Sequence, residues 1–491
     1  MSLRINIAAN YFGRAYAMAA AYLFIPFYVA ILGPSAYGVI AFYAVMLAIA
    51  ALADVGLSST FAREAAREPA KPKLINLLSA AERILLVGVG ALSLAAFAGA
   101  GWIVEHWLNV EDLDKAVTVN ALRLMAITIT PQILISLYSA GLLGLQRQVS
   151  ANAIQALFVT CRSGLVIAVI LWKPDLPTFF LWQLGSTILF AFITRTALMS
   201  AMTLPWSAIA PFRFASVQPH LRYAGGMLLL TVIAGINSQL DKLVVSRSLT
   251  LSEFGYYSLA SLLAQIPVAL TTPIAVALFP KLTEQIARGE TARAYGYYKL
   301  CAQMIAFIGA LAAACLVLFS REILTIWLQQ PSLPAIVAQV TSMLAIGGLF
   351  LCLSLLPYYL SLAHGENRVI AVLSGLTLLA SVPLTIIAIS RYGLVGAASV
   401  WIALNLTNYV AVTLAVHRKY YRDRLTALAL DSVVVHVALA AVPLYLARLA
   451  ANEWASGPVT AVLWAAAGAA VALGAFGTLH RLPLPKSHGS V

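Results

Sequence analysis

Charged residues are scarce in this chain of 491 residues: they make up 10% of it, whereas hydrophobic residues make up 62%. This composition excludes a soluble globular protein, because such a protein needs polar side chains to cover its exterior. Cysteine and histidine are also few, with four cysteines, all in apolar stretches, and seven histidines without ligand-like spacing. The sequence therefore predicts a membrane protein with no disulfide framework, no metal site and no cofactor.

Long apolar stretches are abundant. A helix of about 20 apolar residues is long enough to cross the hydrocarbon core of a bilayer, so we predict an all-α integral membrane protein with about fourteen transmembrane helices. The expected spans are 12–32, 38–62, 84–107, 119–144, 152–172, 178–204, 223–248, 254–280, 297–320, 335–361, 368–390, 393–416, 427–449 and 459–479. The first is expected to be a retained helix rather than a signal peptide, because its small residues lie inside the apolar run.

The basic residues orient these helices. With the N-terminus in the cytoplasm, 21 of the 31 Lys and Arg residues fall in inner loops and helix ends, and six fall in outer loops. This positive-inside distribution predicts that both termini are cytoplasmic. The net charge of +13 then reflects topology, and we expect no nucleic-acid partner, because the cations are spread over loops where membrane lipid attracts them.

Short motifs recur at a nearly constant offset. Segments 35–38 (SAYG) and 252–255 (SEFG) each open a span at an offset of 217, while 106–108 (HWL) and 326–328 (IWL) match at an offset of 220. This periodicity predicts two repeats of six helices. An even number of helices makes the repeats parallel, so we expect a two-lobed bundle around a central cavity, with the lobes related by an axis along the membrane normal.

The repeat divides the chain into four parts. We predict an N-terminal lobe of helices 1–6 (1–204), a cytoplasmic linker (205–222), a C-terminal lobe of helices 7–12 (223–416), and helices 13–14 with a cytoplasmic tail (417–491). Prolines at 205, 211 and 219 favour a linker over a folded domain. The last two helices lie outside the repeat, and we expect them to be peripheral and to line a lipid-facing groove.

A few charged residues interrupt the spans. Each opposes insertion by roughly 2.5 to 3.5 kcal/mol if it faces lipid at a helix centre, so most of them are expected to face water or one another. The predicted substrate-binding residues are Arg162, Arg195, Arg14, Lys242 and Arg123. The acids predicted within spans are Asp54 and Asp241. The excess of cations predicts an interior that attracts anions.

Arg162 and Arg195 are the strongest candidates for an anion site. Arg162 lies near the middle of its predicted helix, ten residues from either end, too deep for easy snorkelling. Arg195 lies just inward of the middle of the next helix. Arginine suits the site because its planar fork of donors matches phosphate oxygens in pairs. A second interpretation stays open, in which these arginines form structural ion pairs with Asp54 or Asp241.

The other charges have less decisive settings. Arg123 lies near the outer end of its helix, where snorkelling to the interface explains it. Arg14 belongs to a polar stripe that marks either an inner vestibule or an interfacial helix end. Asp241 is expected to pair with Lys242 or another cation. An ion-coupling role for Asp54 and Asp241 is the alternative.

Several short motifs together resemble a known family. They are 10–14 (NYFGR), 32–38 (LGPSAYG), 54–57 (DVGL) followed by 63–64 (RE), 241–243 (DKL) and 255–260 (GYYSLA). With them the chain resembles, over essentially its whole length, the Wzx-type polysaccharide flippases of the multidrug/oligosaccharidyl-lipid/polysaccharide exporter superfamily.

The resemblance implies an alternating-access flippase rather than an enzyme. Its implied substrate is an undecaprenyl-diphosphate-linked oligosaccharide, which crosses the bacterial inner membrane for the synthesis of O-antigen, capsule or exopolysaccharide. It also implies cationic residues in the central cavity, and polysaccharide polymerase machinery as a possible partner. The excess of cations found in the spans agrees with a diphosphate headgroup.

Three alternatives stay open: a flippase for lipid-linked peptidoglycan precursor, a multidrug exporter of the same superfamily, and a membrane polymerase or glycosyltransferase of the polysaccharide pathway. An exporter of cationic drugs is expected to carry more acids in its cavity. An enzyme is expected to present acids, His or Arg on a substantial outer loop, whereas the longest outer segments here, 104–119 and 320–334, are short.

Overall fold

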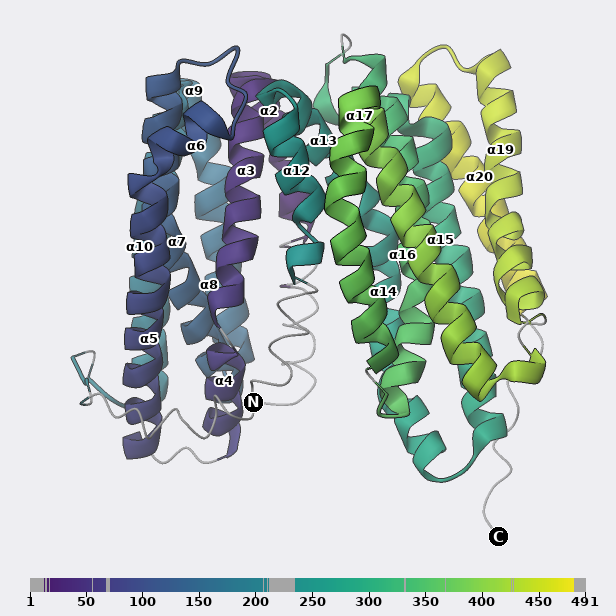
Figure 1. The fold of residues 1–491 in the computed structure, drawn as a ribbon, viewed down its shortest axis with the longest axis horizontal. Helices are drawn as coiled ribbons and strands as arrows, with labels where there is room; N and C mark the ends of the chain where they lie inside the picture. The colour runs from purple at the N-terminus through teal and green to yellow at the C-terminus, as the bar shows by residue number, and fades with distance from the viewer. Residues whose placement is uncertain are drawn as a thin grey trace. The chain divides into compact units, whose positions relative to one another are not determined.

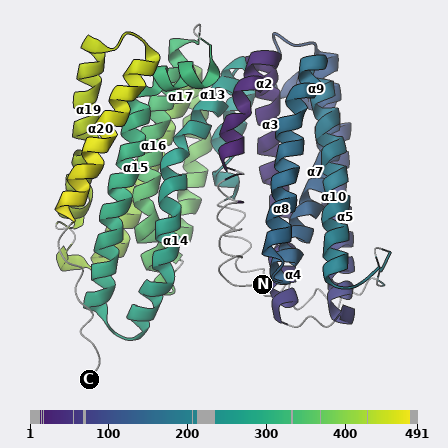
Figure 2. The same cartoon turned by 180° about the vertical axis from the view of Figure 1, so that it is seen from behind.

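The computed structural model describes residues 13, 16, 18–54, 56–67, 71–205, 207–209, 211, 235–330, 333–366, 368–424, 426 and 428–480. The chain forms two compact units, Met1–Gly255 and Tyr256–Val491, called here the N-terminal and C-terminal units. Each unit is built from long helices (Figures 1 and 2). Arg14 and residues 212–222 of the predicted linker lie outside the described residues.

The N-terminal unit contains helices up to the start of α13. They are α2 (Ile25–Leu32), α3 (Pro34–Ala51), η1 (Leu52–Asp54), α4 (Leu57–Arg67), α5 (Lys71–Ala98), α6 (Ala100–His106), α7 (Lys115–Gly144), α8 (Gln148–Val159), η2 (Thr160–Leu165), α9 (Val166–Trp172), α10 (Leu176–Ala201), α12 (Leu240–Ser248) and the first residues of α13 (Leu251–Ala264), which continues into the C-terminal unit. Aspartates cap two of the long helices. Asp114 accepts hydrogen bonds from two backbone amides at the start of α7, and Asp175 accepts one at the start of α10, which satisfies amides that have no partner within the helix.

The C-terminal unit contains the remaining helices. They are α14 (Ile266–Ala287), α15 (Thr291–Leu328), α16 (Ala335–Ala363), α17 (Arg368–Tyr420), η4 (Arg422–Arg424), η5 (Leu428–Val434), α19 (Val435–Trp454) and α20 (Pro458–Leu479). Two of them bend sharply. The backbone leaves the helical conformation at Phe319 in α15 and at Gly393 in α17, where φ is +55°, a value that favours glycine.

Eleven helices in the described part of the chain are long and apolar enough to cross a membrane. The span Ile370–Tyr420 holds the two predicted helices 368–390 and 393–416, and the bend at Gly393 separates them. A shorter apolar helix, Met18–Leu32, covers most of the first predicted span. The chain is thus an all-α multi-pass membrane protein, while the count of fourteen helices stays a prediction, because much of 223–248 lies outside the described residues.

Helix α7 is central to the packing of the N-terminal unit. It packs against α10, α5 and α4, and its buried side chains include Leu122, Ile129 and Leu137. The hydrophobic side chains lie on several faces of α7, as expected of a helix that is surrounded by others. This arrangement brings polar groups of α7 next to those of α10.

Two glycines at equivalent positions of the predicted repeat make a close backbone contact within the N-terminal unit. A Cβ atom on Gly38 would lie 2.1 Å from the carbonyl oxygen of Leu251, and one on Gly255 would lie 2.5 Å from that of Pro34. Only glycine allows this approach. The contact therefore fixes the spacing between α3 and the start of α13, while the internal repeat stays a prediction.

In the C-terminal unit α16 packs against α14, α15 and α17. Helices α19 and α20 pack against each other and against α15, at one edge of this unit (Figures 1 and 2). The ring of Phe307 on α15 stacks on that of Phe476 on α20 with centroids 4.3 Å apart. The two last helices therefore reach this bundle mainly through α15.

Two acids that the predicted spans left out, Glu82 and Glu322, lie within long apolar helices of the structure. The structure places Glu82 in the span Lys73–Ala98 and Glu322 in the span Thr291–Leu328. Both helices extend well beyond the predicted apolar runs, because their polar ends continue the helix after the hydropathy has fallen. Asp54 instead lies at the end of its span, Pro34–Asp54.

Candidate functional site

Arg162 lies in a widened turn of a membrane-spanning helix. The span Gln148–Trp172 is α-helical at both ends, but Thr160–Leu165 form a π-helix. A π turn interrupts the regular backbone hydrogen bonds of an α-helix, and such turns occur frequently at functional sites. The carbonyl groups of this turn therefore become available to partners outside the helix.

Three successive carbonyls of the π turn accept hydrogen bonds from neighbouring helices. The indole nitrogen of Trp182 donates to the carbonyl oxygen of Cys161 at 2.9 Å. The side-chain amide of Gln183 donates to that of Arg162 at 3.0 Å, and the Tyr28 hydroxyl donates to that of Ser163 at 2.5 Å. Side chains from α2 and α10 thus stabilise the irregular backbone, which would otherwise leave polar groups unpaired inside a membrane.

The guanidinium group of Arg162 is held by neutral partners. Its Nε donates to the amide oxygen of Gln183 at 2.5 Å, and a terminal nitrogen donates to the amide oxygen of Gln132 at 3.1 Å. The aromatic rings of Tyr43 and Phe158 lie 5.6 and 5.7 Å from the guanidinium carbon, within the range of cation–π attraction. Among the described residues no carboxylate pairs with Arg162, so its positive charge is not neutralised by them.

Arg162 lines a cavity of about 570 Å³ in the N-terminal unit. The cavity is within the size range of small-molecule sites. Its walls come from the helix ending at Leu32 and from α3, α7, η2 and α10, and combine aromatic with uncharged polar side chains. They include Phe24, Tyr28, Tyr43, Gln132, Ser136, Ser163, Phe179 and Gln183. The site therefore presents one cation among aromatic rings, amides and hydroxyls.

Arg195 has a different setting. Its Nε lies 2.8 Å from the Glu82 carboxylate on α5, and the two side chains are only 13% and 11% exposed. Tyr138 on α7 interacts with both members of this pair. The geometry supports the structural interpretation of Arg195, with Glu82 as the partner in place of the expected Asp54 or Asp241. Arg195 does not line the Arg162 cavity.

The other predicted binding residues do not gather around Arg162. The exposed Arg123 lies over the Phe97 ring, with its guanidinium carbon 5.4 Å from the ring centre. Lys242 is half-buried in α12, and Arg14 lies outside the described residues. Neither Arg123 nor Lys242 lines the Arg162 cavity.

The two predicted ion-coupling acids lie at helix starts. Asp54 accepts hydrogen bonds from the backbone amide and the hydroxyl of Ser58 in the first turn of α4, at 3.2 and 2.9 Å. Asp241 lies in the first turn of α12. A carboxylate at either place is stabilised by the positive end of the helix dipole and by the amides there, which supports a structural role for Asp54 at least as well as ion coupling.

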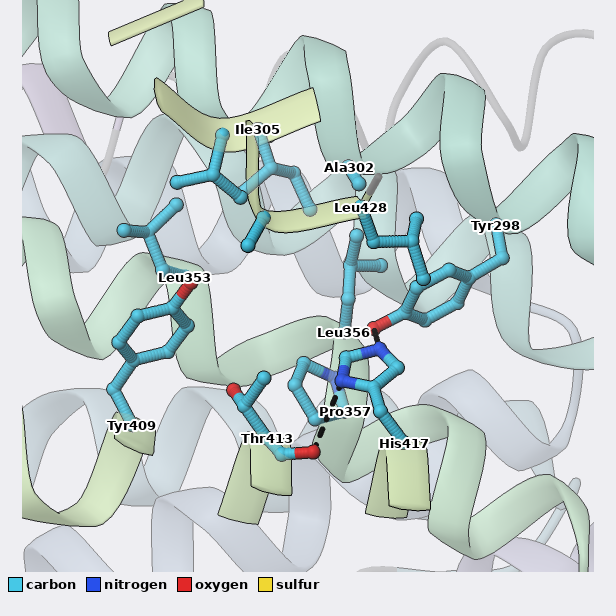
Figure 3. Close-up of a pocket in the computed structure, with 12 residues that line it drawn as sticks. Tyr298, Ala302, Ile305, Leu353, Leu356, Pro357, Tyr409, Thr413, His417 and Leu428 are labelled. Atoms are coloured by element: carbon cyan, nitrogen blue, oxygen red, sulfur yellow. Dashed lines mark hydrogen bonds between the residues drawn. The ribbon is translucent and has the colours of Figure 1, made fainter. Parts of the chain in front are cut away.

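The C-terminal unit holds a much smaller cavity, of about 40 Å³, beside a buried histidine (Figure 3). His417 Nδ1 lies 3.0 Å from the carbonyl oxygen of Thr413, and its Nε2 lies 2.8 Å from the Tyr298 hydroxyl. Because a carbonyl only accepts, Nδ1 carries a proton, and in the neutral ring Nε2 accepts from Tyr298. With aliphatic side chains around it, this arrangement fits helix packing better than the binding of an anion.

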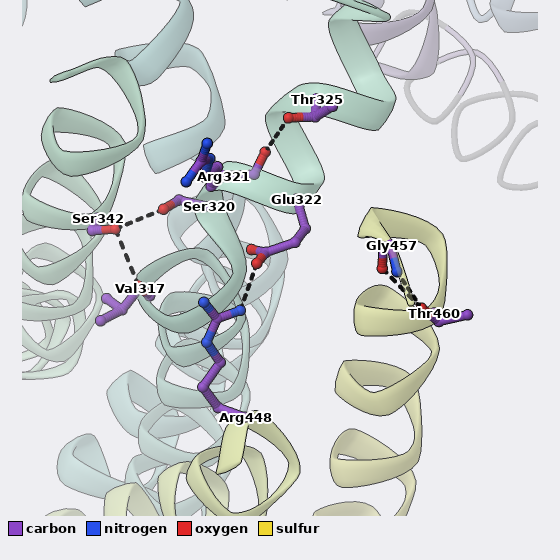
Figure 4. A network of polar contacts seen from close by, with 9 residues as sticks. All are labelled: Val317, Ser320, Arg321, Glu322, Thr325, Ser342, Arg448, Gly457 and Thr460. Atoms are coloured by element: carbon purple, nitrogen blue, oxygen red, sulfur yellow. Dashed lines mark hydrogen bonds and ion pairs between the residues drawn. The ribbon is translucent and has the colours of Figure 1, made fainter. Parts of the chain in front are cut away.

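A second, half-buried arginine pair occurs in the C-terminal unit. Arg448 on α19 donates to the Glu322 carboxylate on α15 at 2.6 Å (Figure 4), and its guanidinium lies 5.3 Å from the centre of the Phe319 ring. The two side chains are 29% and 16% exposed. This pair ties α19 to the bend in α15, and like Arg195 it compensates the cation with a carboxylate.

Sequence reasoning missed Gln132, Gln183 and Glu82, the residues that determine the settings of the two arginines. Gln132 and Gln183 are uncharged polar residues inside predicted spans, and this is the signal by which the sequence could have indicated them. Glu82 lies two positions before the predicted span 84–107, so the predicted helix start excluded it.

Comparisons with known proteins agree with the fold. The lipid II flippase MurJ in an inward closed conformation superposes with a TM-score of 0.73 at 14% identity, covering 97% of this chain and 99% of that one. A multidrug resistance MATE family transporter of the MOP superfamily, in an inward-facing conformation, gives a TM-score of 0.65 at 15% identity, covering 86% and 96%. This chain is thus a multi-pass membrane protein with the fold of these two-lobed transporters.

Residues 3–285 match the family model described as polysaccharide biosynthesis protein, and the chain belongs to that family. A putative O-antigen transporter of Shigella flexneri is 22% identical over 411 residues, which are 82% of this chain and 94% of that protein.

Proposed function

We propose that this protein is a flippase that moves a polyprenyl-diphosphate-linked oligosaccharide across the bacterial inner membrane for the synthesis of surface polysaccharide. The family match, the similarity to a putative O-antigen transporter and the transporter fold support this function. The proposal includes cytoplasmic termini, a cytoplasmic linker and contact with the polysaccharide polymerase machinery. It is a transport function without chemical conversion of the substrate.

The observation that carries the proposal is the setting of Arg162. A full positive charge lies within a membrane-spanning helix, half-buried, and the groups that hold it are amides and aromatic rings. A charge inside a membrane raises the free energy of insertion, and charges that are kept there usually belong to a functional site. An anionic headgroup that enters the cavity would compensate it, and the headgroup of the proposed substrate is a diphosphate.

The rest of the cavity suits a sugar attached to that headgroup. Sugar rings present apolar faces and rims of hydroxyl groups. The rings of Phe24, Tyr28 and Phe179 offer apolar surface, while Ser136 and Ser163 offer hydroxyls that both donate and accept. One cation beside a neutral polar and aromatic wall therefore fits the junction between a phosphate and a sugar.

An apolar groove in the C-terminal unit supports the lipid part of the proposal. It has a volume of about 390 Å³ and lies between α15, α16 and α19, with Val317, Leu349 and Val437 among its lining residues. Its lining is almost wholly aliphatic. We assign it to a segment of the polyprenyl chain, in line with the expectation that the helices after the repeat line a lipid-facing groove.

A flippase for peptidoglycan precursor is the second candidate, because the fold matches the lipid II flippase MurJ. Both candidate substrates carry a diphosphate, so Arg162 does not discriminate between them. The sugar does, and a test therefore has to vary it.

The test is transport by purified protein in liposomes, with polyprenyl-diphosphate-linked oligosaccharide compared with peptidoglycan precursor. We expect movement of the former and at most slow movement of the latter. Equal or better transport of peptidoglycan precursor would favour the second candidate, and no transport of either would contradict a flippase. Adding proton and sodium gradients separately tests coupling through Asp54 and Asp241, for which the helix-capping position of Asp54 predicts no effect of its replacement by Asn.

A further inference from the structure

We infer that Gln132 and Gln183 determine the specificity of the Arg162 site, because they position its guanidinium without neutralising it, so that the site accepts a single oxyanion. This inference rests on the proposed flippase function and deepens it. The oxyanion is either a phosphate of the lipid headgroup or a carboxylate of an acidic sugar, since both have the same complementarity to arginine.

The hydrogen bonds of Arg162 leave donors for such a ligand. A guanidinium group has five N–H donors. The bonds to Gln183 and Gln132 use one on Nε and one on a terminal nitrogen. Among the described residues only these two amides accept from this side chain. The other three donors, all on the two terminal nitrogens, are not used by the described residues, and we assign them to the ligand. These two nitrogens form the edge that binds an oxyanion in a bidentate manner.

Gln183 holds both the side chain and the backbone of Arg162. Its amide oxygen accepts from Nε at 2.5 Å, while its amide nitrogen donates to the carbonyl oxygen of Arg162 at 3.0 Å. Gln183 is 3% exposed, so water does not substitute easily for these bonds. No other uncharged side chain of this shape both donates and accepts; glutamate lacks the donor and adds a charge, and leucine lacks both groups.

The pair Arg195–Glu82 shows what a carboxylate does in the same unit. There the acid lies 2.8 Å from Nε, the same nitrogen that meets an amide oxygen at Arg162. A carboxylate at that place neutralises the charge of the arginine, so that the pair as a whole carries no net charge. The chemical difference between the two sites is thus an amide against a carboxylate, and it separates a site that attracts anions from one that does not.

The experiment uses near-isosteric exchanges. Gln183→Glu and Gln132→Glu place a carboxylate against Arg162, Gln183→Leu removes the hydrogen bonds while keeping the charge, and Glu82→Gln is the matched opposite exchange at Arg195. Full-length protein is purified, its thermal unfolding is measured, and transport is measured in liposomes with a lipid-diphosphate-linked neutral sugar and with the same lipid carrying a glucuronate.

We expect Gln183→Glu to stay folded, because the ion pair that it gains offsets the hydrogen bond to the Arg162 carbonyl that it loses, yet to lose about tenfold or more of transport. Gln132→Glu behaves alike with a smaller loss. Gln183→Leu lowers the unfolding temperature and reduces transport in part. Glu82→Gln lowers the unfolding temperature with little change in transport per folded molecule. Loss with both substrates identifies the bound oxyanion as the diphosphate, and loss with the glucuronate lipid alone identifies it as the sugar carboxylate.

The inference is overturned if Gln183→Glu transports both substrates within about twofold of wild type while Arg162→Ala transports neither. In that case Arg162 is required but the neutrality of its partners is not. If Arg162→Ala transports normally, Arg162 has no part in transport, and the assignment of the headgroup to this cavity fails before the role of the glutamines is in question.

Discussion

Arg162 and Arg195 lie in the same unit, each within a membrane-spanning helix, and both were predicted to bind substrate. Arg162 meets two amides and two aromatic rings beside a cavity of about 570 Å³, whereas Arg195 meets a buried carboxylate. A charge in a membrane requires compensation. Where a carboxylate supplies it, as at Arg195, the arginine joins helices. At Arg162 no described residue supplies a negative charge, and we propose that a ligand does.

The same distinction applies in the C-terminal unit. Arg448 pairs with Glu322, and the buried His417 is satisfied by hydrogen bonds to neutral groups. Arg162 is therefore the clearest case among the described residues of a deeply placed cation without an acidic partner. Substitutions that exchange or remove these partners test the comparison.

The largest functional effect is expected at Arg162. Arg162→Ala and Arg162→Gln should abolish transport, because the charge that attracts the headgroup is lost, while membrane insertion is kept. Arg162→Lys should retain part of the activity, since the charge survives but the bidentate fork does not. The measurement is transport in liposomes together with protein abundance in the membrane. Normal transport by Arg162→Ala would show that Arg162, like Arg195, has no part in binding the substrate.

At the Arg195–Glu82 pair we expect the largest effect on stability. Arg195→Ala or Glu82→Ala leaves a buried charge without its partner and should destabilise the protein by about 3–5 kcal/mol. The double variant Arg195→Ala/Glu82→Ala should be more stable than either single variant, because no uncompensated charge remains. A double-mutant cycle from unfolding measurements checks this. A stable Arg195→Ala protein that fails to transport would instead place Arg195 in the binding machinery.

A smaller effect is expected at Arg448. Its side chain is 29% exposed, about twice the exposure at Arg195, so that solvent or lipid headgroups replace part of the interaction. Glu322→Gln should destabilise the protein by about 1–2 kcal/mol, between the values for exposed pairs and for hydrogen bonds to charged groups. Transport per folded molecule should stay near wild type. A loss as large as that for Glu82→Gln would show that exposure does not separate the two pairs.

The smallest effect is expected at Arg123. Its side chain is exposed, and the cation–π contact with Phe97 contributes about 0.5–1 kcal/mol at such sites. Arg123→Ala should therefore change neither abundance nor transport by more than about twofold. A severe transport defect in a stable Arg123→Ala protein would add a second substrate-binding cation to Arg162.

Most of the helices were predictable from the sequence, because an apolar run of about 20 residues is a local property and its length as a helix matches the hydrocarbon core of a bilayer. Helix ends were less predictable. Glu82 was assigned outside its span because the apolar run begins at about residue 84, whereas the helix itself begins earlier, at Lys73. The π turn at Thr160–Leu165 carries no hydropathy signal at all, since it changes hydrogen bonding and not composition.

The position of Arg162 deep in a span was decided by the sequence alone, and so was the conclusion that such a charge needs compensation. Which groups hold Arg162 and Arg195 was decided only by the tertiary structure. Glu82 is 113 residues from Arg195 in the chain, and Gln132 is 30 residues from Arg162, so neither pairing follows from local spacing. The packing of α7 and α10 against their neighbours brings an amide to one arginine and a carboxylate to the other, and the physical difference between these two partners is a single negative charge.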